Sequence, residues 1–220
     1  MTSGGPKIPR TNLVFEADPA NTFSSTAGSN IVLDLTGRTG SGTAGPANLS
    51  ISGSNCGVWG MANSTEINFS NKFVNYVTGT AAIWCKPLVS TVGHKGIFTN
   101  QNTWGMFTFS NEYVVYDWSV GGGNRATGIN LYTDGLWHHC AISFQDIDAG
   151  DAAVNVFLDG RLVLVTSVTQ NAAGSNTTIA SGNGLQYWQG YIGQTLFYDR
   201  KLAVDEIQQI YDATRGRYER

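Results

Sequence analysis

The sequence predicts an all-β protein, a sandwich of two antiparallel sheets with one short C-terminal helix. Short apolar or alternating runs recur from Leu13 onward, and clusters of Gly, Asn, Ser and Asp separate them, as in antiparallel folds. The chain has 220 residues with 27 glycines, and only 13% of the residues are charged. A chain of this length buries one substantial core, and its glycines supply the positive φ angles that many turns need.

The predicted elements follow one another in a simple order. Residues 1–12 are polar, contain Pro6 and Pro9, and are expected to form an extended N-terminal arm before a single domain over 13–220. We expect strands at 13–17, 31–35, 49–52, 65–69, 80–88, 96–100, 104–110, 113–120, 137–144, 153–168 and 187–200, and loops at 36–48 and 121–127.

Two local signals are the clearest. Asp159-Gly160 separates two alternating runs, which predicts a two-residue hairpin turn with positive φ at both positions. At 203–214, Val204, Ile207 and Ile210 recur at helical spacing, with acidic residues in the first turn, which predicts the C-terminal helix.

Composition excludes several classes of partner. The formal net charge is −3 and the pI is about 5.5, so we expect no nucleic acid and no membrane as partner. The N-terminus lacks the apolar core of a signal peptide, and the three cysteines are far apart in sequence. We therefore expect reduced thiols and synthesis in a cytoplasm.

Several segments in this order carry a family resemblance: IVLDLTGRTG, FVNYVTGTAAIWCKP, DGLWHHCAISF, NVFLDGRLV and YIGQTLFYDRKLAVDEIQQIYDATRGRY. Over about residues 12–218 the chain resembles laminin-G-like, concanavalin A-like domains of the pentraxin type, and most closely those of tailed-phage virion proteins. The resemblance implies a jelly-roll sandwich of about 12–14 strands.

The segment Trp137-His138-His139-Cys140 looks like a metal site or a nucleophile with its base, but its pattern favours a strand. Alternation puts His138 and Cys140 on one face and Trp137 and His139 on the other, so the adjacent histidines cannot chelate one ion. We interpret both histidines as structural and expect Cys140 to be buried near Cys85.

No catalytic residues are predicted. Glycosidases need two carboxylates facing each other across a cleft. The nearest candidates, Glu16 and Asp18, lie on one face of the same strand; Pro19 follows them directly, and no third carboxylate follows.

The resemblance makes calcium the candidate ion, because many such domains bind it at one rim. Asp146, Asp148 and Asp151 offer three carboxylates within six residues, the hard oxygen ligands that calcium prefers. The alternative is a solvated hairpin turn. The resemblance favours that alternative, because the closing strand of many relatives reads Gly-Tyr-Ile-Asp, whereas here Gln194 follows Tyr191-Ile192-Gly193.

A glycan site would need exposed aromatic rings beside amide groups. Trp104 and Trp118 adjoin polar loops, with Asn102 and Asn124 as hydrogen-bonding neighbours, and these four are the candidate glycan-binding residues. They make a lectin-like module for host glycans the alternative function.

The favoured function is structural. Similarity of the closing segment to phage particle proteins implies a non-enzymatic component of the virion surface, either a head decoration protein or a fibre or tail part. On this reading Lys7, Ile8, Pro9 and Arg10 of the arm dock on other virion proteins, and the chain forms a homo-oligomer, with a trimer expected by analogy.

Overall fold

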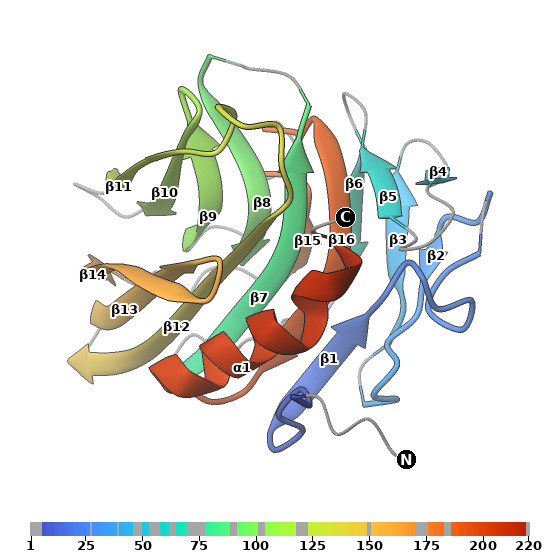
Figure 1. The fold of residues 1–220 in the computed structure, drawn as a ribbon, viewed down its shortest axis with the longest axis horizontal. Helices are drawn as coiled ribbons and strands as arrows, with labels where there is room; N and C mark the ends of the chain where they lie inside the picture. Colours follow the sequence, from blue (N-terminus) through green and yellow to red (C-terminus); the bar gives the residue numbers. More distant parts are fainter. Residues whose placement is uncertain are drawn as a thin grey trace.

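A computed structural model of the chain describes residues 6–26, 28–38, 40–45, 50–52, 58–61, 65–69, 78–88, 92–100, 104–117, 123–148, 151–169, 176–182 and 186–218. Over these residues two antiparallel eight-stranded sheets form a sandwich, and one helix lies across the outer face of the first sheet (Figure 1). The predicted all-β sandwich with a short C-terminal helix is confirmed, with 16 described strands where 12–14 were expected.

The first sheet carries the longest strands. In spatial order they are β14 (Arg161–Thr169), β13 (Asp151–Leu158), β12 (His138–Asp148), β7 (Thr78–Pro87), β16 (Gly190–Tyr198), β5 (Val58–Met61) and β4 (Ser50–Ser52), and β1 (Leu13–Ala17) also pairs with β16.

The second sheet lies behind the first in Figure 1. Its strands in spatial order are β11 (Asn124–Asn130), β10 (Glu112–Asp117), β9 (Trp104–Phe109), β8 (His94–Asn100), β15 (Thr177–Ile179), β6 (Glu66–Phe69), β3 (Gly42–Gly45) and β2 (Ile31–Val32).

Alternation along the strands builds the core between the sheets. On β12, Cys140, Ile142 and Phe144 point inward, whereas Ala141 points to the outer face, as the sequence predicts. Cys140 Sγ lies 3.7 Å from Cys85 Sγ, and both cysteines are buried and free, so the expected proximity of the two thiols is confirmed.

The helix α1 (Val204–Thr214) covers the outer face of the first sheet. Ile207 and Ile210 pack with Ala82, Ala141 and Phe157 on three neighbouring strands. The carboxylate of Glu206 accepts the N–H of Ala203 (3.0 Å) at the N-terminal end of the helix, and the short 3-10 helix η1 (Arg215–Arg217) follows at the other end.

The predicted hairpin turn is also confirmed. Asp159 and Gly160 have φ values of 51° and 77°, the positive values that a type I′ turn requires, and they join β13 to β14.

The sequence prediction was wrong for several short elements. The strand expected at 31–35 ends at Val32, because the Asp34 carboxylate accepts the N–H groups of Glu16 and Thr36 and turns the chain. The loops expected at 36–48 and 121–127 contain β3 and the start of β11, whose small and polar side chains hide their pairing. The strands β5 and β15 were also not predicted.

The described part of the N-terminal arm lies on its own domain. Ile8 packs on the apolar layer under α1, Gln209 Nε2 donates to the carbonyl of Lys7, and Tyr198 Oη donates to the carbonyl of Pro9 (3.0 Å). Lys7 and Arg10 are exposed, and Arg10 forms an ion pair with Glu16. Docking of this arm on another subunit stays a prediction.

No helix in the described part of the chain is long and apolar enough to cross a membrane.

Candidate functional site

Of the four residues predicted to bind glycans, the structure describes the side chain of Asn124 only. Asn124 begins β11, and its Oδ1 lies 2.8 Å from Nε2 of His94, whose ring contacts Phe109 (4.6 Å between centroids) and Tyr116 (4.3 Å). Asn102, Trp118 and the side chain of Trp104 lie outside the described residues. The expected tryptophan pair therefore stays a prediction.

The three carboxylates predicted to hold calcium lie on paired strands rather than in a long loop. Asp146 pairs with Ala152, and Asp148 pairs with Asp151, so β12 and β13 extend almost to their connection. The structure brings no three His, Cys, Asp or Glu side chains together as a metal site among the residues it describes. The side chain of Asp148 lies outside those residues, and a calcium site here stays a prediction.

The carboxylates considered for catalysis are held by ion pairs. Glu16 is 7% exposed and pairs with Arg10, and it also accepts the side-chain amide of Gln194 (3.0 Å). Asp18 forms a bidentate pair with Arg217, with both N–O distances 2.8 Å. Both groups tie the N-terminal region to the rest of the domain.

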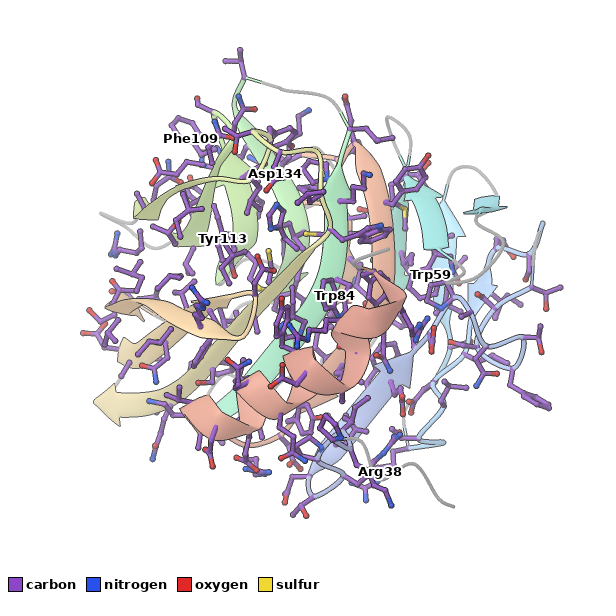
Figure 2. The ribbon with its side chains drawn as sticks, in the orientation of Figure 1. Arg38, Trp59, Trp84, Phe109, Tyr113 and Asp134 are labelled. Atoms are coloured by element: carbon purple, nitrogen blue, oxygen red, sulfur yellow. The ribbon has the colours of Figure 1, made fainter. Side chains whose placement is uncertain are left out.

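Aromatic and charged side chains instead meet at a cavity of about 330 Å³ at one end of the first sheet. The loop 131–137, the start of β12, the Asp159-Gly160 turn, β7 and the C-terminal segment all contribute to it. Its lining residues are Lys86, Asp134, Leu136, Trp137, His138, Asp159 and Tyr218. Figure 2 shows Asp134 on the loop that leads into β12 and Trp84 under α1.

Strand pairing explains why these residues meet. The strands β12 and β13 are antiparallel neighbours, so the start of β12 lies beside the end of β13 and places His138 next to Asp159. The loop before β12 adds Asp134, whose carboxylate also accepts the N–H of Leu136 (2.9 Å).

His138 is held between two carboxylates. Its Nδ1 lies 3.1 Å from Asp159 Oδ2, and its Nε2 lies 3.2 Å from Asp134 Oδ1. Burial alone would lower the pKa of His138, but the hydrogen bond to Asp159 and the charges of Asp159 and Asp134 raise the pKa to about 9. At neutral pH the ring is therefore an imidazolium that donates to both carboxylates.

His139 has the opposite environment. Its side chain is 1% exposed and points to the outer face of the sheet, where its ring lies 5.2 Å from the ring of Trp84. Burial lowers the pKa of His139 to about 4, so this ring is neutral at neutral pH. The prediction that the two adjacent histidines point to opposite faces agrees with this geometry, and His138 is bound by two carboxylates.

The aromatic wall of the cavity continues an aromatic layer under the helix. Trp137 is half-buried, with ring centroids 4.9 Å from Tyr218 and 6.2 Å from Tyr191. Tyr218 stacks on the buried Trp84 at 4.5 Å, and Trp84 Nε1 donates to Thr214 Oγ1 (2.8 Å). Trp137 is therefore held in place by packing while part of it stays open to solvent.

Sequence reasoning missed Asp134, Asp159 as a carboxylate of the site, and Tyr218. A signal was present, since Asp-Gly pairs stand at 134–135 and 159–160, at the two ends that antiparallel pairing brings together. Tyr218 follows the helix by a short 3-10 turn, and no local pattern indicates where its ring would lie.

Comparison with known protein families assigns most of the chain to one of them. A family model of the laminin G type, described as the concanavalin A-like lectin/glucanases superfamily, matches residues 61–208, more than half of the chain. The chain belongs to this family. No curated protein matches the sequence of this concanavalin A-like domain.

Solved structures show the same fold at low sequence identity. Domain 4 of AbnA, an extracellular arabinanase from Geobacillus stearothermophilus in complex with arabinotriose, aligns with a TM-score of 0.70 and 17% identity over 91% of this chain and 98% of that domain. The receptor-binding domain of botulinum neurotoxin type G aligns with a TM-score of 0.63 and 12% identity over 91% of this chain and 51% of that chain. Trypanosoma rangeli sialidase aligns with a TM-score of 0.65 and 13% identity over 94% of this chain and 34% of that chain.

The concanavalin A-like domain thus spans nearly all of the arabinanase domain, about half of the neurotoxin chain and about a third of the sialidase. These comparisons give no support to the expected likeness to tailed-phage virion proteins.

Proposed function

We propose that this concanavalin A-like domain is a carbohydrate-binding module and that the cavity beside Trp137 holds the sugar. One observation carries the proposal: a fixed, half-exposed tryptophan lies beside two carboxylates and a lysine in the same cavity. A sugar needs both kinds of group, since its C–H face packs on an aromatic ring while its hydroxyls donate to carboxylates and accept from ammonium groups.

The size of the cavity limits the ligand. About 330 Å³ is near the lower end of the range for small-molecule sites, about 300–1,000 Å³, and suits one or two sugar units. The complex of the arabinanase domain with arabinotriose supports a glycan as ligand of this fold.

We propose further that binding occurs without catalysis. A general acid of a glycosidase needs a raised pKa, but the pKa of Asp134 is lowered: burial would raise it, and the N–H of Leu136 together with the charge of His138 outweighs burial. One carboxylate oxygen of Asp159 accepts the backbone N–H of His139, and the other accepts Nδ1–H of the His138 imidazolium. Asp134 is therefore arranged to stay ionised, and both carboxylates accept hydrogen bonds.

The test is a screen of immobilised neutral and acidic glycans, followed by calorimetric titration of the best ligand. We expect Trp137→Ala to weaken binding at least about tenfold, or about 1.4 kcal/mol. Phe109→Ala is the matched control, because Phe109 is an aromatic side chain 37% exposed on the second sheet and contributes nothing to the cavity. Circular dichroism would establish that both variants are folded. Equal affinity of Trp137→Ala and the unchanged protein would overturn the proposal, as would a screen with no bound glycan.

The virion role stays a second proposal. It places the chain on the surface of a phage particle, as a homo-oligomer with other virion proteins as partners, and a glycan-binding module on a particle would combine both functions. Quantitative mass spectrometry of purified particles would test it, with absence of the chain from particles as the contrary result.

A further inference from the structure

A second cavity lies next to the cavity beside Trp137, with the Asp159-Gly160 turn between them. Its volume is about 490 Å³, and it lies between the β13–β14 hairpin and α1. Asp159 lines both cavities, so the two are neighbours with this residue between them. A ligand longer than one sugar unit could occupy both.

The chemistry of the second cavity differs from that of the first. It has no tryptophan, and its polar lining residues are Asp159, Arg161, Gln208, Tyr211 and Arg215, with apolar groups such as Leu158 between them. Arg161 is the first residue of β14, and Arg215 is the residue that directly follows α1. Two guanidinium groups from separate elements thus meet at one cavity.

The two arginines are held differently. Arg215 lies over the ring of Tyr211, 5.5 Å from its centroid, and pairs with Asp212 at 3.4 Å. The side chain of Arg161 is exposed and makes no hydrogen bond or ion pair with any residue that the structure describes. Arg161 therefore keeps its full donor fork for a ligand, and Arg215 adds the positive charge of a second guanidinium to the lining of the same cavity.

Charges around the two cavities together leave one positive charge in excess. The carboxylate of Asp159 is bound to His138, and that of Asp212 accepts both Arg215 and Gln208. Three carboxylates, those of Asp134, Asp159 and Asp212, thus stand against four cationic groups, those of Lys86, His138, Arg161 and Arg215. This balance favours a ligand with one negative charge, and a guanidinium binds a carboxylate in bidentate geometry.

The wall between the two cavities is tightly packed. A Cβ on Gly160 would lie 2.8 Å from Oε1 of Gln208 and 3.0 Å from Cβ of Tyr211, so the turn presses against the helix. The spacing between the two cavities is therefore set by the fold rather than by a flexible loop.

From this arrangement we infer that the ligand is an acidic oligosaccharide, with a neutral sugar beside Trp137 and the carboxylate of the adjoining sugar bound by Arg161 and Arg215. The inference rests on the proposed carbohydrate-binding function and adds the class of ligand. The two linings differ, with Trp137 in the first cavity and Arg161 and Arg215 in the second, and this difference sets which sugar of the ligand lies in which cavity.

The experiment compares two forms of one ligand. An oligosaccharide with a single uronic acid next to a neutral sugar is titrated into the protein, and so is the same oligosaccharide after reduction of its carboxyl group to an alcohol. We expect the acidic form to bind at least about tenfold more tightly, and we expect 0.5 M NaCl to reduce that preference.

Two variants locate the preference. Arg161→Ala and Arg215→Ala should each lower the affinity for the acidic form by a larger factor than the affinity for the reduced form, so that the preference for the acidic form decreases. Arg161→Ala is the cleaner variant, since that side chain has no described partner whose loss would disturb the fold. Arg38→Ala is the matched control, because Arg38 is an exposed arginine outside both cavities.

The outcomes separate the inference from the proposed function. If both forms bind equally and Trp137→Ala weakens both, the domain binds carbohydrate and the inference about the acidic sugar is wrong. If the acidic preference persists in both arginine variants, the carboxylate lies elsewhere and the inference is also wrong. If Trp137→Ala changes neither affinity, the proposed function itself fails.

Discussion

Nδ1 of His138 lies 3.1 Å from Oδ2 of Asp159, and this contact joins the first residue of β12 to the turn that ends β13. With Asp134 on the other side of the ring, it makes a charged group part of the wall of the cavity beside Trp137. The arrangement has consequences for stability as well as for binding.

The His138 contact predicts a loss of stability at alkaline pH. The pKa of His138 is about 9 in the folded protein against 6.5 in the unfolded chain. The folded state therefore holds the proton more tightly, so the stabilisation is complete below pH 6.5 and disappears as the pH rises through 9. Because the two aspartates are partly exposed, we expect the free energy of unfolding to fall by about 1–2 kcal/mol over this interval.

Urea unfolding at pH 6, 7.5 and 9.5 measures this effect. The difference in unfolding free energy between the unchanged protein and His138→Gln should be largest at pH 6 and smallest at pH 9.5. A difference that does not change with pH would mean that the pKa of His138 is the same in the folded and unfolded states, contrary to this prediction. In NMR titration, the neighbouring His139 should stay neutral down to about pH 4.

The hydrogen bond from Trp84 to Thr214 predicts a specific cost of deletion. Both side chains are buried, and Trp84 Nε1 donates to Thr214 Oγ1 at 2.8 Å, which connects the first sheet to the end of α1. Thr214→Val removes the acceptor and leaves the indole N–H without a partner. We expect a loss of about 1–3 kcal/mol in the free energy of unfolding.

Thr214→Ser is the matched control for that substitution. It keeps the hydroxyl, and we expect it to recover most of the stability lost in Thr214→Val. Thr214→Val keeps a methyl group at this site, so a Thr214→Val variant that is as stable as the unchanged protein while Thr214→Ser is destabilised would mean that packing of the methyl group, rather than the hydrogen bond, stabilises this contact.

The turn at Gly160 predicts a difference between two glycines with nearly the same positive φ. Gly160 has a φ of 77° and close neighbours on α1, whereas Gly128 has a φ of 76° and nothing within 4 Å of a Cβ built on it. Gly128→Ala should therefore cost only the strain of positive φ, about 1–2 kcal/mol.

Gly160→Ala should cost more than Gly128→Ala, because the turn must also move away from Gln208 and Tyr211. Differential scanning calorimetry of the two variants compares the costs directly. We also expect Gly160→Ala to weaken the preference for the acidic oligosaccharide, since the wall between the cavities would shift. Equal melting temperatures for the two variants would contradict the close packing of the turn against α1.

Strong local patterns predicted the long elements of this fold. Alternation over 137–144, the Asp159-Gly160 pair and the helical spacing of Ile207 and Ile210 each correspond to an element of the structure. The strands β3 and β11 escaped prediction because their residues, GTAG and NRATGIN, are small or polar, and only the neighbouring strands make them part of a sheet.

The candidate site was harder to predict because it depends on which strands are neighbours. Alternation correctly placed His138 and His139 on opposite faces, but it does not show that the loop before β12 brings Asp134 to the ring of His138. Trp137 was interpreted as part of a strand, although it immediately precedes β12 and remains half-exposed. Its partner Tyr218 is 81 positions away, a separation across which no periodic pattern extends.

The pairing of β1 with β16 has a consequence for biosynthesis. β16 lies between β7 and β5 in the first sheet and also pairs with β1, so the centre of that sheet is made of residues 190–198. A nascent chain that stops before this strand has β7, β5 and β1 without their shared neighbour. We therefore expect the domain to fold after translation has passed residue 198 rather than stepwise on the ribosome, and to fold slowly, as proteins with mostly non-local contacts do.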